Sequence, residues 1–239
     1  MITAIVLAVI TILALSHVAP FPFLFDVAAG KLCVWRVSVP AKEKVLYLTF
    51  DDGPNLSATP QLLDLLREQK VRATFFLIDT YVDARSAPIV RRMFEEGHTV
   101  GLHSGDRWLM TKSPEALARR LRAAADRIEL YAGYRPAGFF RPHGGWRSVP
   151  MLVGLSGLRY RLAGWSWMAW DWSWFRERTA ERVASQVISH AGPGKIIVIH
   201  DGHHKDREAN RLYAIHATRL IIDGLKSRGF EFATLSDAP

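Results

Sequence analysis

Beyond residue 44, the apolar positions alternate between short β-rich runs and longer runs with helical spacing. The β-rich runs predict strands at Val45–Phe50, Ala73–Ile78, His98–His103, Gly138–Arg141, Tyr160–Trp167, Lys195–His200 and Phe230–Leu235. The helical runs predict helices after Pro60, over Ala87–Glu96, from Ser113 to Leu130, between the fourth and fifth strands, and over Arg207–Arg228. Strands that alternate with helices are typical of an α/β fold with a parallel sheet, either open or closed into a barrel.

Ionisable side chains that could catalyse a reaction or bind a metal lie at the carboxyl ends of four of these strands. Asp51 and Asp52 follow the first strand, His103 ends the third, Arg141 the fourth and His200 the sixth. In parallel α/β folds the carboxyl ends of the strands lie on one face of the molecule. We therefore expect these residues, although far apart in sequence, to meet at one mouth.

The first 25 residues contain no acidic residue, lysine or arginine. Ile2–Val18 is almost entirely apolar, and Pro20 and Pro22 end any helix that forms there. About 17 to 25 apolar residues suit a helix that crosses a bilayer. We therefore expect a membrane anchor at residues 1–25, with a cleavable signal peptide and a buried helix as alternatives. A linker at 26–41 and one domain at 42–239 complete the predicted organisation.

Composition narrows the partners only a little. A formal net charge of +8 and a pI of about 9.9 favour contact with polyanions. The basic residues are scattered as singles and pairs, such as Arg91–Arg92 and Arg119–Arg120, so we expect no nucleic-acid partner. The single cysteine, Cys33, excludes a disulfide within the chain.

The segment Thr49–Pro54, which has the sequence TFDDGP, carries the strongest chemical signal. Two adjacent carboxylates at the end of an apolar strand can divide the work of hydrolysis between them. One can bind a metal ion that lowers the pKa of water, and the other can take the proton from that water. His103 is then the expected imidazole ligand. The alternative for the Asp-Gly pair is a turn that caps a helix.

Later segments supply the remaining groups that an acyl transfer requires. Arg141 can hold a carboxylate ionised, and Gly144 offers a backbone N–H to a developing oxyanion. His200 can act as a general acid if a carboxylate such as Asp171 keeps it protonated. The run Trp165–Trp174 holds five of the eight tryptophans, and indole faces suit sugar rings. Each of these features has a simpler alternative. Arg141 can be a surface arginine and Gly144 a loop glycine. The segment after His200 can be a plain turn, and core packing can explain the tryptophans.

Taken in order, these segments resemble the polysaccharide deacetylase family, the NodB-homology domain of carbohydrate esterase family 4. The resemblance covers roughly residues 42 to 237. It rests on TFDDGP at Thr49–Pro54, on Arg141, on the pair Asp171–Trp172, and on the Ile-Val-Ile-His run that ends at His200. It implies a deformed (β/α) barrel of about seven parallel strands, preceded here by the N-terminal hydrophobic helix.

The resemblance also implies a role for each matched residue. Asp51 is then the general base and Asp52 a ligand of a divalent metal, generally Zn²⁺. Arg141 orients the base, and the N–H of Gly144 joins the oxyanion site. Trp172 belongs with Asp171 to a motif that we assign to substrate binding and catalysis, and we add His143 to the substrate site.

One motif departs from the family pattern. The family has H-[S/T]-x-x-H, whereas this chain has His103-Ser-Gly-Asp-Arg107, so one histidine ligand is replaced by Arg107. A catalytic zinc normally has three protein ligands. If a helix starts at His103, Asp106 shares its face and can substitute, and it ranks before His143 and His203. We expect Asp52 and His103 to approach within about 5 Å, with one of these three completing the set. Gly144 also stands where the family has tyrosine, which should widen the site.

Three functional hypotheses follow. The first is removal of N-acetyl groups from an amino-sugar-containing cell-envelope glycan or a lipid-linked saccharide, by a domain held outside the cytoplasm. The second is deformylation of a lipid-linked aminosugar. The third is a glycan-binding module without catalysis, which the retained Asp51, Arg141, Asp171 and His200 argue against, because a binder needs no paired acid and base.

Overall fold

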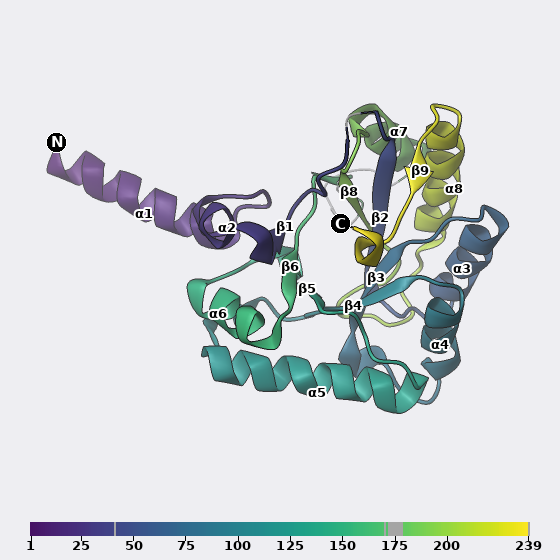
Figure 1. Cartoon of the computed structure of the whole chain (residues 1–239), viewed down its shortest axis with the longest axis horizontal. Helices are drawn as coiled ribbons and strands as arrows, with labels where there is room; N and C mark the ends of the chain where they lie inside the picture. The colour runs from purple at the N-terminus through teal and green to yellow at the C-terminus, as the bar shows by residue number, and fades with distance from the viewer. Residues whose placement is uncertain (41, 170, 172–178, 239) are drawn as a thin grey trace.

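The computed structural model describes residues 1–40, 42–169, 171 and 179–238. Its strands form one curled sheet in which every ladder is parallel (Figure 1). The strands follow the order β1-β6-β5-β4-β3-β2-β8-β7, and β9 pairs with β2. Their bounds are β1 (Cys33–Val34), β2 (Val45–Gly53), β3 (Thr74–Ile78), β4 (Thr99–His103), β5 (Phe139–Arg141), β6 (Arg161–Ala163), β7 (Trp167–Met168), β8 (Ile196–His200) and β9 (Glu231–Phe232).

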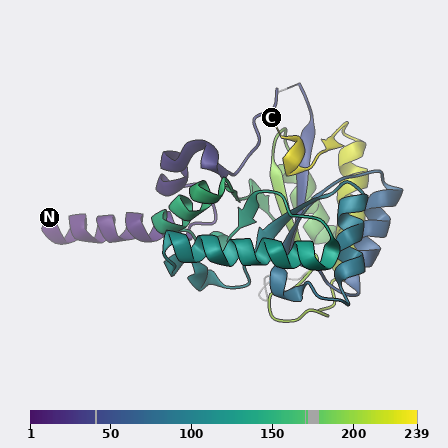
Figure 2. The same ribbon diagram turned by 60° about the horizontal axis from the view of Figure 1, so that its bottom comes forward.

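Helices cover the outside of the curled sheet (Figures 1 and 2). Neighbouring helices contact one another in the order α6, α5, α4, α3, α8, α7, which follows the order of the strands beneath them. Their bounds are α3 (Ala58–Glu68), α4 (Ala87–Glu95), α5 (Pro114–Ala132), α6 (Val149–Leu158), α7 (Ala180–His190) and α8 (Leu212–Lys226). Strands inside and helices outside make this an α/β half-barrel, a more open form of the deformed (β/α) barrel that the resemblance implies.

Alternation along the strands separates the two faces of the sheet. In β2, Leu48 and Phe50 belong to the large apolar core between the sheet and the helices. Tyr47, one position before Leu48, belongs instead to a smaller apolar cluster. Thr49 and Asp51 follow Tyr47 at intervals of two and so point to the same inner side. The polar inner face of β2 is therefore confined to its carboxyl end.

The smaller apolar cluster fills the other end of the barrel interior. Tyr47, Phe76, Phe139 and Ile196 reach it from four different strands, and all are buried. Leu235 of the short helix η5 (Leu235–Asp237) joins them, so the C-terminal segment packs into the barrel from below the site. Because this end is filled with apolar side chains, only the opposite end is available for polar chemistry.

The predicted strands are largely confirmed, with two differences. The predicted strand Tyr160–Trp167 is two strands, β6 and β7, which pair with different neighbours. The chain changes neighbours between them: the N–H of Gly164 donates to Val34, and the N–H of Ser166 donates to Ile196. Strand β1 lies within residues 26–41, which were predicted as a linker and which also contain the short helix η1 (Gly30–Leu32). The described strands thus number nine rather than about seven.

Helix α1 (Ile2–Val18) points away from the barrel, and α2 (Leu24–Ala29) lies between them (Figures 1 and 2). Most of the apolar side chains of α1 are exposed. Within the described part of the chain, no helix has both the length and the apolar character that a membrane crossing requires. Helix α1 comprises 17 residues, and the anchor expected at residues 1–25 stays a prediction.

Candidate active site

A bulge at the end of β2 turns two adjacent carboxylates toward one pocket. Neighbouring residues of a regular strand point to opposite faces. Between Asp51 and Gly53 the register against β3 shifts, and Asp52 has a φ of 69°. This extra residue in a left-handed conformation redirects its side chain, as bulges next to active sites commonly do. Both Asp51 and Asp52 line the pocket and both are buried.

Three buried side chains beside the bulge can hold a metal ion. Asp52, His103 and His143 each offer one ligand atom, and these atoms all lie within 4.8 Å of one another. His103 Nε2 lies 3.2 Å from Asp52 Oδ1, within the approach predicted from the sequence. His103 Nδ1 donates to the carbonyl oxygen of Arg141 at 2.8 Å. A backbone acceptor on one ring nitrogen leaves the other nitrogen free to bind a metal.

The electrostatics of this group suit a divalent cation. Burial lowers the pKa of His143 to about 3, with the neighbouring His103 acting in the same direction, so His143 is neutral at pH 7. Burial alone would raise the pKa of Asp52, but the adjacent His103, His200 and His143 hold it below its usual range. His143 Nδ1 and Asp52 Oδ1 are buried without a hydrogen-bond partner among the described residues. Unpartnered buried lone pairs are costly unless a ligand satisfies them, so these residues fit a metal ion.

The structure places His143, and not Asp106, beside Asp52 and His103. Asp106 is exposed and lies outside the group of potential metal ligands, because the chain after His103 is not helical as the spacing argument required. Asp106 has extended backbone angles, and its Oδ1 accepts from the N–H of Trp108 at the start of the short helix η3 (Arg107–Thr111). His143 completes the set instead. His203 lines the pocket but is not one of the three.

A buried arginine holds Asp51 on the opposite side of the bulge. Arg141 is fully buried, and its Nη1 donates to Asp51 Oδ1 at 2.7 Å and to Thr49 Oγ1 at 2.7 Å. Its other nitrogens donate to the carbonyl oxygens of Ala163 and Gly164. Because these acceptors fix the guanidinium, it holds the Asp51 carboxylate in one orientation.

A second charged pair closes the other side of the pocket. Asp171 is fully buried, and its Oδ1 lies 2.9 Å from His200 Nδ1 while its Oδ2 accepts from the backbone N–H of His200 at 2.8 Å. Burial lowers the pKa of His200, but the charge and hydrogen bond of Asp171 outweigh it and raise this pKa to about 9. His200 is therefore protonated at neutral pH and able to give a proton. Trp172 lies outside the described residues.

A pocket of about 450 Å³ is lined by Asp51, Asp52, His103, His143 and His200. Gly144, in the short helix η4 (His143–Gly145), forms part of its wall with a φ of 62°, a conformation that favours glycine. The indole of Trp165 lines the pocket as well. The sequence therefore identified much of the lining correctly, although from segments as far apart as residues 51 and 200.

The N-terminal segment supplies a wall that sequence reasoning missed. Val18 and Pro20 line the pocket. They are held there by Arg147, which is fully buried, donates to the carbonyl oxygen of Ala19 and pairs with the carboxylate of Asp26. The one available signal was Asp26 itself, the first acidic residue after an apolar start. Residues 18–26 are thus integral to the site.

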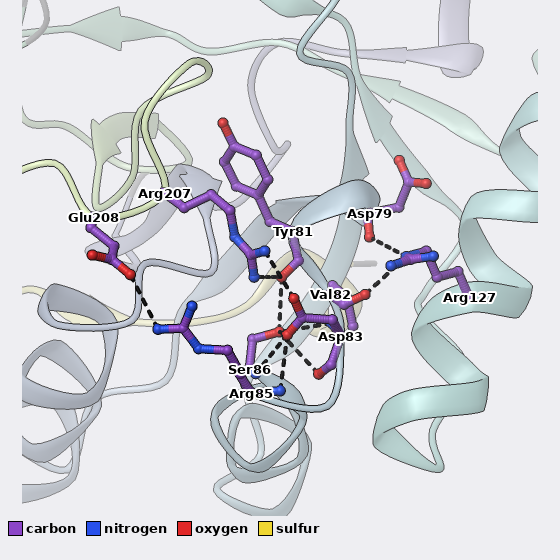
Figure 3. A network of polar contacts seen from close by, with 9 residues as sticks. All are labelled: Asp79, Tyr81, Val82, Asp83, Arg85, Ser86, Arg127, Arg207 and Glu208. Carbon is purple, nitrogen blue, oxygen red and sulfur yellow. Dashed lines mark hydrogen bonds and ion pairs between the residues drawn. The ribbon is translucent and has the colours of Figure 1, made fainter.

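The loop after β8 forms another wall and is tied down at several points. A side chain at Gly202 would place its Cβ 1.9 Å from the Asp52 carbonyl oxygen, so only glycine lets this loop lie on the bulge. Farther along, Arg207 binds Asp83 and the Tyr81 carbonyl oxygen (Figure 3). The Tyr81 hydroxyl in turn donates to the carbonyl oxygen of His203. These contacts fix His203 and the neighbouring residues against the pocket.

Comparison with known proteins agrees with this geometry. Residues 38–160 match the sequence profile of the polysaccharide deacetylase family. The chain is 32% identical over 200 residues to a peptidoglycan-N-acetylglucosamine deacetylase of Bacillus cereus, covering 83% of this chain and 90% of that protein. It is 31% identical over 206 residues to a chitooligosaccharide deacetylase of Azorhizobium caulinodans, covering 82% of this chain and 95% of the other.

Solved structures give the same result. A peptidoglycan N-acetylglucosamine deacetylase in complex with 4-naphthalen-1-yl-N-oxidanyl-benzamide superposes with a TM-score of 0.74, at 29% identity over 90% of this chain and 95% of that one. A family 4 acetyl xylan esterase from Clostridium thermocellum, in complex with a cobalt ion, gives a TM-score of 0.69 at 34% identity over 81% and 89% of the two chains. This chain therefore belongs to the polysaccharide deacetylase family.

Proposed function

We propose that this protein is a divalent-metal-dependent deacetylase that removes N-acetyl groups from amino sugars of a cell-envelope glycan. One observation carries the proposal: a held base and a held acid line the same pocket as three metal-ligating side chains. Asp51 is paired with Arg141, and His200 with Asp171. A binding module has no use for both pairs. The relatives named for peptidoglycan and chitooligosaccharides support the class of substrate.

Asp52, His103 and His143 are the residues that would hold the metal. When bound, a divalent cation supplies Lewis acidity that lowers the pKa of water and polarises the amide carbonyl. Three nitrogen and oxygen ligands leave a fourth position open, as in catalytic zinc sites, so we propose Zn²⁺. The neutral His143 and the ionised Asp52 present the lone pairs that such an ion requires.

The chain's own groups then divide the proton transfers. Asp51, oriented by Arg141, takes a proton from the attacking water while the oxygen of that water bonds to the acetyl carbon. The backbone N–H of Gly144 faces the oxygen that becomes negative. His200 gives its proton to the sugar nitrogen as the C–N bond breaks, which releases acetate and a free amine. Asp171 stabilises the charged imidazole until that step.

The test is acetate release by the purified full chain after loading with Zn²⁺. Chitotetraose, peptidoglycan and a lipid-linked N-acetylated saccharide are the substrates, and formate release from an N-formylated saccharide tests the deformylase alternative. Asp51→Asn should lower kcat by roughly 10²- to 10⁴-fold, which is the usual contribution of a general base. Asp106→Asn, outside the ligand set, is the matched control. If the loaded parent releases no acetate from any of these substrates, the proposal fails.

We also propose that the domain acts outside the cytoplasm, because the glycans for which its relatives are named belong to cell envelopes and extracellular polymers. Intact cells that express the chain should convert externally added chitotetraose. Externally added protease should abolish that conversion while a cytoplasmic reporter enzyme stays active. Activity found only after lysis would contradict this location.

A further inference from the structure

The catalytic pocket contains two arginines that have no carboxylate partner among the described residues. Arg107 and Arg211 both line it, and neither forms an ion pair there, although arginines elsewhere in the described chain commonly do. They come from different loops: Arg107 begins η3, and Arg211 directly precedes α8. Neither has been given a role in the proposed hydrolysis.

Arg211 is the more informative of the two, because it is only 3% exposed. Its Nη1 donates to the hydroxyl of Tyr213. Its Nε is buried without a hydrogen-bond partner in the described structure. A buried cation with an unsatisfied N–H is destabilising unless an anion or acceptor reaches it. Since Arg211 faces the pocket, the partner that it lacks can approach from the substrate side.

Arg107 is held at the rim of the same pocket. Its guanidinium lies 5.5 Å from the centre of the Trp146 ring, a cation–π contact that restrains the long side chain. A Cβ at Gly144 would lie 3.6 Å from Arg107 Nε, an ordinary van der Waals distance. Arg107 therefore lies next to Gly144 in the wall of the pocket.

The carboxylates of the pocket are not available to these arginines. Among the described lining residues, the carboxylates are Asp51 and Asp52. Arg141 is paired with Asp51, and Asp52 belongs to the group that would hold the metal. No described lining carboxylate is therefore left for Arg107 or Arg211.

The loop that carries Arg211 is rigidly attached. Arg207 binds Asp83, and Arg85 binds Glu208, so two ion pairs join this loop to the segment between β3 and α4 (Figure 3). A preorganised donor loses little conformational entropy when its ligand binds. Arg211 can therefore act as a fixed hydrogen-bond donor to an anion, whereas a surface arginine would be mobile.

We propose that Arg107 and Arg211 form an anion subsite, which selects glycans that carry a carboxylate or a phosphate on or next to the sugar that is deacetylated. The inference rests on the proposed function and names its substrate class. Both anions present planar or tetrahedral oxygen pairs that a guanidinium binds in a bidentate manner. A lactyl or uronic carboxylate and a sugar phosphate are thus two sources of one chemistry.

The experiment compares substrates that differ only in charge. The Zn²⁺-loaded full chain is assayed for acetate release on a peptide-free strand with free lactyl carboxylates, and on the same strand after the carboxylates are converted to methylamides. A second pair is an N-acetylglucosamine oligomer with a terminal phosphate and its dephosphorylated form. In at least one pair, kcat/KM should favour the anionic member roughly 10- to 100-fold, the range of one or two charge-assisted hydrogen bonds. The pair that responds identifies the source of the anion.

Variants then test whether the two arginines cause the preference. Arg107→Gln and Arg211→Gln should each lower the anionic-to-neutral ratio at least fivefold, through KM rather than kcat, and the lysine variants should retain part of it. Arg122→Gln, which removes an exposed charge of α5 outside the pocket, should leave the ratio as it is. Raising the ionic strength of the parent assay should also reduce the ratio, which tests the charge without relying on the folding of an Arg211 variant.

Two results overturn the subsite. One is a ratio near one in both pairs for the parent, with acetate still released, which would leave the proposed deacetylase function intact. The other is an anionic preference that survives both glutamine variants. Absence of acetate from every substrate is a different result, because it overturns the proposed function itself.

Discussion

Replacing Asp171 with asparagine should move the alkaline limit of activity to lower pH. In the protein as it stands, Asp171 contacts His200 twice, at the ring nitrogen Nδ1 and at the backbone N–H. Asparagine keeps the shape and one acceptor but removes the charge, and it can turn an NH₂ group toward Nδ1. That group favours a neutral imidazole with a lone pair at Nδ1, which is the wrong form for a general acid.

The size of the effect follows from the pKa of His200, which Asp171 raises from 6.5 to about 9 against the opposing effect of burial. At 1.36 kcal/mol per pH unit, this difference corresponds to about 3 kcal/mol in favour of the protonated form. Because the folded pKa lies above the unfolded one, this stabilisation is complete below about pH 6.5 and disappears as the pH rises through about 9. Without Asp171, only the charges of Asp52 and Asp51 oppose the effect of burial, so the pKa of His200 should fall well below 9.

Two measurements check this prediction. For the Zn²⁺-loaded enzyme, the pH at which kcat falls on the alkaline side should be two or more units lower in Asp171→Asn than in the parent. Titration of the His200 ring by NMR in metal-free protein should give the same direction. Asp64→Asn, at an exposed position of α3, is the control for loss of one acidic charge. If His200 titrates alike in parent and Asp171→Asn, the electrostatic reasoning is refuted.

Three further predictions concern the metal site, the N-terminal wall and the loop after β8. His143→Ala should weaken Zn²⁺ binding, measured by calorimetry, by more than about 100-fold, since changes to residues that only support a ligand cost about 10- to 100-fold. Asp106→Asn, the control, should change the affinity little. Equal affinities of the parent and His143→Ala would exclude His143 as a ligand. Arg147→Met should lower the urea-derived free energy of unfolding by about 3–5 kcal/mol, because it strands the buried carboxylate of Asp26, and a loss below about 1 kcal/mol would contradict this. Burial raises the pKa of Asp201 from 3.8 to about 7, so this carboxyl group destabilises the fold progressively as the pH rises from about 3.8 to about 7, and the loss is complete above that value. Asp201→Asn should therefore raise the Tm of metal-free protein more at pH 8 than at pH 5, and an equal change at both values would show that Asp201 ionises freely.

The sequence alone determined the barrel and much of the chemistry at its mouth. Short runs rich in β-branched, aromatic and leucine side chains predict strands, and a parallel strand that is covered on both faces is apolar almost throughout. The runs ending at Asp51, His103, Arg141 and His200 were therefore recognisable one by one. The rule that the carboxyl ends of parallel strands lie on one face was enough to predict that these residues lie together. The proposed pairing of His200 with Asp171 also rested on simple electrostatics.

Only the tertiary structure shows which side chain lies third beside Asp52 and His103, and which segments form the two remaining walls of the pocket. Sequence spacing placed Asp106 beside His103 only if the chain between them were helical, and contacts from elsewhere gave that segment another conformation. Ser104, for example, accepts a hydrogen bond from the N–H of His143, some 40 residues later in the chain. Arg147 likewise finds Asp26 across 121 positions. Local periodicity carries no information about such pairs, because a loop has no repeating geometry and its partners are chosen by packing against the rest of the molecule.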